Sequence, residues 1–174
     1  MFHPVSHFRT ITKHRHVVMQ HCFRAGIPVQ GLLHDLSKYS PTEFFPGAVF
    51  YQGTRSPNEA EREKNGYSTA WMHHKGRNRH HFEYWTDYNP QTKTMDPVPM
   101  PTRYLIEMFC DRVAASKVYR GKDYADGDAL AYFERARNTR KIHPKTAKQL
   151  HFLLKMLAEQ GEEKTFAYIR KMKK

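Results

Sequence analysis

Apolar side chains recur every three or four residues along much of the chain, which is the spacing of amphipathic helices. The clearest case spans residues 10–25, where Ile11 and Cys22 share one inward-facing stripe with His14 and His21. A glycine and a proline directly after this stretch end the helix. The same signals predict helices over residues 32–36, 68–74, 102–119, 128–137, 144–159 and 166–172, with two more starting after Ser40 and Ser56.

The prediction that helices start after Ser40 and Ser56 depends on capping residues. Ser40 and Glu43 have the spacing of a capping box with a proline at the first helical position, and Ser56 with Glu59 repeats it. Each serine is therefore interpreted as an N-cap.

Residues 86–101 contain four prolines, so we predict an ordered loop there, or a lid over a site. No run of alternating apolar residues is long enough to require a sheet. We therefore predict an all-α fold, and 174 residues suit one domain. The expected organisation is a single helical bundle over residues 1–174, with a functional core at 10–120 and C-terminal helices at 128–172.

The chain is strongly basic. It has 29 Lys and Arg against 17 Asp and Glu, a formal net charge of +12. Such a surface attracts phosphates, nucleotides or nucleic acid. The alternative is that the charge serves solubility alone.

The two cysteines, Cys22 and Cys110, form no Cys-x-x-Cys motif and indicate a reducing compartment. The first residues do not resemble a secretion signal, and no stretch approaches the ~18 apolar residues that a membrane span requires. We expect a cytoplasmic protein without membrane contact.

The 12 histidines are informative through their placement. Imidazoles and carboxylates without thiolates suit a catalytic site for zinc, iron or manganese, and not a structural zinc cluster. The candidate ligands are His14, His34-Asp35, His73-His74, His80-His81 and Asp111.

Asp111 and His14 each have a second interpretation. Asp111 shares a stripe with Ala115, so its carboxylate should face the core and needs a metal, hydrogen bonds or an arginine from another helix. His14 would otherwise be a core histidine, and His16 or His21 would take its role if the helix were rotated.

Arg77 and Arg79 lie between the two later histidine pairs. This segment is either a solvated basic loop or part of the metal site. The two interpretations are compatible, because a metal site that handles phosphate would have arginines beside its ligands.

In chain order, His14, His34-Asp35 and Asp111 resemble the His…His-Asp…Asp pattern of the HD-domain superfamily of metal-dependent phosphohydrolases. The histidines at 73–74 and 80–81 resemble the extra ligands of its two-metal members. Residues 34–38 are similar to the His-Asp-x-Gly-Lys core of the HD-GYP cyclic-dinucleotide phosphodiesterases, with serine in place of the glycine.

The Gly-Tyr-Pro signature of that group is missing after His81, so its substrate is not implied. Residues 70–81, together with 53–57, resemble a small bacterial and phage HD-like family with no assigned reaction.

The resemblance implies one or two divalent ions, of manganese, iron, zinc or magnesium, with Asp35 bridging if two are present. Activated water would then attack a phosphomonoester or phosphodiester, such as a nucleotide. The implied ligands are His14, His34, Asp35, His74, His80, His81 and Asp111, with the choice within 73–74 and 80–81 open.

Asp35 and Lys38 are the predicted catalytic residues. Lys38 should share a helix face with His34, four residues earlier, and so reach the substrate. The predicted phosphate-binding residues are Lys38, Arg77 and Arg79, although Lys38 would otherwise be an ordinary solvent-facing lysine.

Two other functions fit the same residues. Some HD-fold proteins with two irons are oxygenases of small polyols or phosphonates. Alternatively, the chain is a non-catalytic nucleic-acid-binding module in which tyrosines stack on bases. The candidates for stacking are Tyr51, Tyr67, Tyr84 and Tyr88.

Overall fold

The computed structural model describes residues 2–135 and 139–172, and most of these residues are helical. The prediction of a helical protein is confirmed in this general form. The helices are α1 Pro4–Arg24, α2 Pro28–Leu33, α3 Pro41–Val49, α4 Pro57–Asn65, α5 Thr69–Arg77, α6 Thr102–Arg120, α7 Asp128–Arg135 and α8 Pro144–Lys171. Short 3-10 turns lie at Leu36–Tyr39, Phe82–Tyr84 and Gly121–Asp123.

Ser40, Ser56 and Ser68 precede helices as expected, but only Ser68 makes a side-chain cap hydrogen bond. The backbone N–H of Trp71 donates to Ser68 Oγ at 3.0 Å at the start of α5, whereas Ser40 and Ser56 precede α3 and α4 without a side-chain cap bond. At the other end of the chain, the two predicted helices 144–159 and 166–172 belong to one helix, α8, which is broken at Gly161 with φ of 76°.

The helix predicted over 128–137 ends at Arg135 within the described residues, and positions 136–137 lie outside them. No helix of the described chain is both long and apolar enough to cross a membrane.

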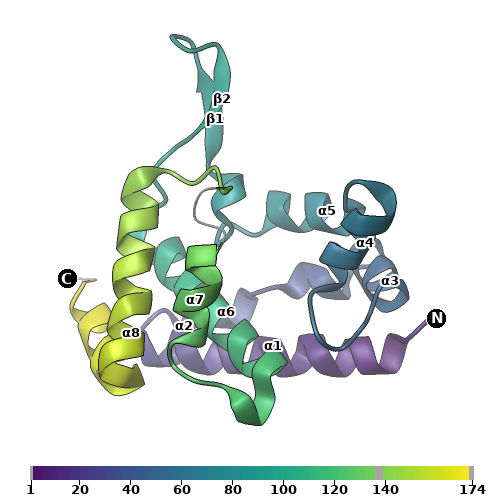
Figure 1. Cartoon of the computed structure of the whole chain (residues 1–174), viewed down its shortest axis with the longest axis horizontal. Helices are drawn as coiled ribbons and strands as arrows, with labels where there is room; N and C mark the ends of the chain where they lie inside the picture. Colours follow the sequence, from purple (N-terminus) through teal and green to yellow (C-terminus); the bar gives the residue numbers. More distant parts are fainter. Residues whose placement is uncertain (1, 136–138, 173–174) are drawn as a thin grey trace.

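The hydrophobic core forms around α6. Its fully buried Leu105, Phe109 and Val113 pack with Val18 of α1, and α8 covers them from another side. Figure 1 shows α1 running along one edge of the molecule, with α8 steeply inclined to it. The buried α8 side chains in this core are Leu150, Leu153, Leu154, Leu157, Phe166 and Ile169.

The expectation of no sheet is wrong in one place. Strands β1 Thr86–Asn89 and β2 Thr94–Pro97 pair antiparallel, within the segment predicted as a loop or lid. Most of their residues are exposed, so the hairpin has no apolar alternation that would reveal it in the sequence. It projects away from the helices (Figure 1).

The predicted helix over 32–36 is also wrong in its second half. α2 ends at Leu33, and Asp35 has a left-handed backbone with φ of 54°. The 3-10 turn Leu36–Tyr39 follows, so Lys38 does not share an α-helical face with His34 as predicted. Aspartate is one of the few residues other than glycine that adopt this conformation readily.

Candidate metal centre

Several elements distant in sequence direct histidines and carboxylates into one buried region. α1 contributes His14, and the junction after α2 contributes His34 and Asp35. The last turns of α5 and the loop after it supply three histidines, and α6 adds a carboxylate opposite them. These four residues are His74, His80, His81 and Asp111.

One group of ligand atoms lies between α1, α6 and the junction after α2. Asp111 Oδ1 is 3.0 Å from His14 Nε2 and 3.6 Å from His34 Nε2. Asp35 Oδ2 is 3.3 Å from His34 Nε2 and 3.8 Å from His14 Nε2. These four side chains bring their ligand atoms within 4.8 Å of one another, as required to hold one metal ion.

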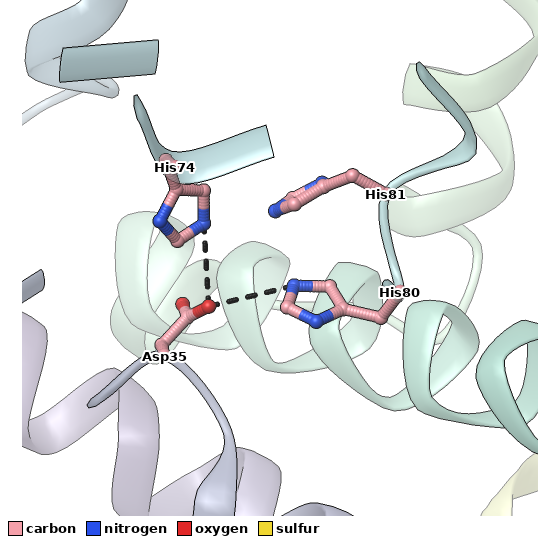
Figure 2. Close-up of side chains that lie close together, drawn as sticks. All are labelled: Asp35, His74, His80 and His81. Atoms are coloured by element: carbon pink, nitrogen blue, oxygen red, sulfur yellow. Dashed lines mark ion pairs between the residues drawn. The ribbon is translucent and has the colours of Figure 1, made fainter. Parts of the chain in front are cut away.

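A second group uses the other oxygen of the same aspartate. Asp35 Oδ1 is 3.3 Å from His74 Nε2 and 3.4 Å from His80 Nε2. Figure 2 shows the rings of His74, His80 and His81 surrounding the space beside this carboxylate. Asp35 therefore belongs to both groups, one through each oxygen.

Many of these atoms are buried and have no hydrogen-bond partner among residues 2–135 and 139–172. They include Asp35 Oδ1 and the Nε2 atoms of His14, His34, His80 and His81, whereas Asp35 Oδ2 forms an ion pair with Lys38. Buried polar atoms without partners are rare in folded proteins, and each one needs an explanation. Inward-facing imidazole nitrogens and carboxylate oxygens are the donors that zinc, iron and manganese prefer, so these residues fit a divalent metal.

Two buried glutamates hold the histidine rings from behind. Glu107 Oε1 accepts a hydrogen bond from His34 Nδ1 at 2.9 Å and lies 3.1 Å from His80 Nδ1. Glu43 binds the Nδ1 atoms of His73 and His74, each at 2.7 Å. A ring whose Nδ1 donates to a carboxylate presents Nε2 as a lone pair, which is the usual arrangement behind a metal-binding histidine.

Sequence reasoning missed both glutamates as site residues. Glu43 was interpreted as a capping residue. Glu107 carried a usable signal, because it lies four residues before Asp111 and therefore on the same side of α6. These contacts also distinguish the two histidines of the pair 73–74. His74 faces Asp35 and can act as a ligand, whereas His73 contacts Glu43.

The charges of the centre are strongly coupled. Burial alone would raise the pKa of Asp35, but the positive charges of His34 and Lys38 outweigh burial and hold this pKa well below its usual value. Burial, and then Lys38, lowers the pKa of His14; burial, and then His80, lowers that of His81. Both rings are therefore neutral near pH 7, the form that binds metals.

A family model described as a family of unknown function (DUF5662) matches residues 3–156. The chain belongs to DUF5662. No curated protein and no solved structure matches it. The matched range includes every candidate ligand of this DUF5662 protein and both glutamates behind them.

A cavity of about 850 Å³ opens beside the candidate centre of the DUF5662 chain. His14, His74, His81 and Asp111 line it, and so does Lys38. The wall beyond them is rich in arginine and includes Arg55, Arg62, Arg112, Arg120, Arg135 and Arg140.

The cavity includes only one of the three predicted phosphate-binding residues. Lys38 lines it, with Nζ 2.5 Å from Asp35 Oδ2. Arg77 donates to the backbone oxygen of His73, and Arg79 lies against Tyr84 and the hydroxyl of Tyr104; neither arginine lines the cavity. Residues 86–101, all of them described, do not line it either, so the predicted lid does not cover this site.

Proposed function

We propose that this chain is a metal-dependent phosphohydrolase whose centre would hold two divalent ions, with Asp35 available to both. The observation that best supports the proposal is the convergence, in two groups that share Asp35, of buried ligand atoms, most of which have no hydrogen-bond partner in the described part of the chain. The first ion would bind His14, His34 and Asp111, and the second would bind His74, His80 and His81.

The residues of the chain would have distinct tasks in this reaction. When bound, divalent ions supply the Lewis acidity that activates water near neutral pH and offsets charge on phosphoryl oxygens. Glu43 and Glu107 would keep the ligand rings oriented through Nδ1. Lys38, at the wall of the cavity, would place a positive charge against the phosphate oxygens.

The basic cavity supports phosphate as the reacting group. Arginines pair with phosphate through parallel hydrogen bonds, and they line this cavity beyond the ligands. The donor set also suits iron, so the oxygenase that the resemblance allows is the second candidate. A purely nucleic-acid-binding function would leave the unpartnered buried ligand atoms unexplained.

The test begins with elemental analysis of tag-free protein that has been purified without added metal. We expect near-stoichiometric metal in the wild type and loss of it in His34→Ala and Asp35→Ala. His16→Ala is the matched control, because His16 is an exposed histidine on α1 outside both ligand groups. A wild type that holds no metal, even after reconstitution, would refute the proposal.

The second step separates the two reactions. Reconstituted protein is assayed on p-nitrophenyl phosphate and bis-p-nitrophenyl phosphate with manganese, magnesium, zinc or iron. Hydrolysis that chelator abolishes supports the phosphohydrolase. Iron content with oxygen consumption on a phosphonate or polyol, and no hydrolysis with any metal, would favour the oxygenase.

A further inference from the structure

The arginines at the far end of the cavity differ in how their charge is balanced. Arg120 forms an ion pair with Asp128 at 3.4 Å. Arg112 and Arg140 also line the cavity, but neither has an ion pair with a carboxylate among residues 2–135 and 139–172. Two guanidinium groups therefore face one cavity without a counter-ion in the described chain.

These two arginines lie beside the same aromatic ring. The guanidinium carbons of Arg112 and Arg140 are 5.9 Å and 5.7 Å from the centre of the same Phe133 ring. Arg112 Nε is buried and has no hydrogen-bond partner within the described residues.

Glu83 does not neutralise the pair. Glu83 borders the same end of the cavity, yet its Oε2 is buried without a hydrogen-bond partner and it makes no ion pair within the described chain. One carboxylate offsets at most one of the two guanidinium charges, so Arg112, Arg140 and Glu83 together remain positive. The unpartnered Nε of Arg112 and the planar guanidinium of Arg140 are suited to an anion such as phosphate.

The arginine pair adjoins the candidate metal centre. Arg112 directly follows Asp111 on α6, and both side chains line the same cavity. A single ligand lying along this wall would touch the ligand groups at one end and the arginines at the other.

We propose that Arg112 and Arg140 form a second anion subsite, so that the substrate is a phosphate ester bearing a second phosphate group. The assignment of the reacting phosphate rests on the proposed function, but the binding of the second phosphate does not. Mononucleotides with one phosphate are then poorer ligands than bisphosphates of the same nucleoside.

The test compares adenosine 5′-monophosphate with adenosine 3′,5′-bisphosphate as probes. Binding to the full chain is measured by calorimetry in excess chelator, where no turnover occurs, with circular dichroism as a check of the fold. We expect the wild type to bind the bisphosphate about tenfold more tightly, since hydrogen bonds to a charged group contribute about that factor. Arg112→Gln and Arg140→Gln should each remove most of this preference.

Arg9→Gln is the matched control, because Arg9 is exposed on α1 outside the cavity and its change removes the same charge. Arg112→Lys keeps the charge without the planar fork and should retain only part of the preference. A wild type without preference, or a preference that survives in both glutamine variants, would show the arginines to be structural and overturn the subsite.

The design separates this inference from the proposed function. One outcome is a preference for the bisphosphate in chelator that depends on the arginines, together with no hydrolysis under any metal. This outcome rejects the phosphohydrolase and supports the subsite. Metal-dependent hydrolysis with equal KM for both nucleotides, unchanged in Arg140→Gln, supports the phosphohydrolase and rejects the subsite.

Discussion

Replacing Glu107 by glutamine is the most discriminating test of the candidate centre, because Glu107 contacts the Nδ1 atoms of two histidines and its replacement leaves their Nε2 atoms unchanged. Glu107 Oε1 is 2.9 Å from His34 Nδ1 and 3.1 Å from His80 Nδ1, so it supports one histidine in each ligand group. Loss of such a partner typically weakens metal binding roughly 10- to 100-fold. Glutamine keeps the shape and one acceptor oxygen, so we expect the lower end, about tenfold for each ion.

The assay is a competition titration of zinc or manganese against a chelating dye, which resolves the two binding steps. Glu43→Gln provides the comparison, since Glu43 supports His74 of the second group only and should weaken one step. Glu159→Gln, at an exposed ion pair with Lys155 on α8, should weaken neither. If Glu107→Gln binds both ions as tightly as the wild type, the histidines are not metal ligands held from behind by this carboxylate.

Three further predictions concern the supporting structure. Gly31→Ala should lower the free energy of unfolding by about 1–3 kcal/mol, because the new Cβ would lie 2.7 Å from Cys22 Cβ; in chemical denaturation, Gly76→Ala, with open space around it, is the control. Burial raises the pKa of Glu162, but hydrogen bonds from Lys117 and Arg24 outweigh it and lower that pKa below 4.5. The stability that this carboxylate adds is therefore present above pH 4.5 and lost as pH falls through the lower folded value, so the Tm deficit of Glu162→Gln should shrink in acid. Lys38→Gln should retain metal and lower turnover of p-nitrophenyl phosphate roughly tenfold or more, whereas equal turnover would remove Lys38 from the mechanism.

The helices and the order of the candidate ligands could be predicted from the sequence because both are local patterns. Spacing of apolar residues identifies α1 and α6, and His14 and Asp111 follow as inward-facing positions on them. The junction at Asp35 could not be predicted, since its left-handed backbone is imposed by packing around it and helical propensity gives no warning. The exposed β1–β2 hairpin was not predicted for the opposite reason. It has no buried face, so its sequence shows no alternation of apolar and polar residues.

The rest of the site depends on contacts between distant segments. Glu43 contacts His73 and His74, which lie about thirty residues later, and no sequence pattern near Glu43 indicates these contacts. Arg112 and Arg140 come together around Phe133 only once α7 has packed beside α6. Conversely, Arg77 and Arg79 lie between the histidine pairs in the sequence, which suggests phosphate binding. Their side chains make their hydrogen bonds outside the cavity.

The sharing of Asp35 between two ligand groups has a consequence for how the centre would fill. This carboxylate forms an ion pair with the ammonium of Lys38 at 2.5 Å. It also lies beside His34, whose pKa burial lowers but the charge of Asp35 raises above its usual value. The first ion to arrive would have to displace that ammonium and release protons, whereas the second would find the carboxylate already freed. Loading would then be cooperative, most strongly at low pH where His34 keeps its proton, and the first ion would bind more tightly as pH rises. At low pH the protein would respond to metal supply as a threshold and not in proportion.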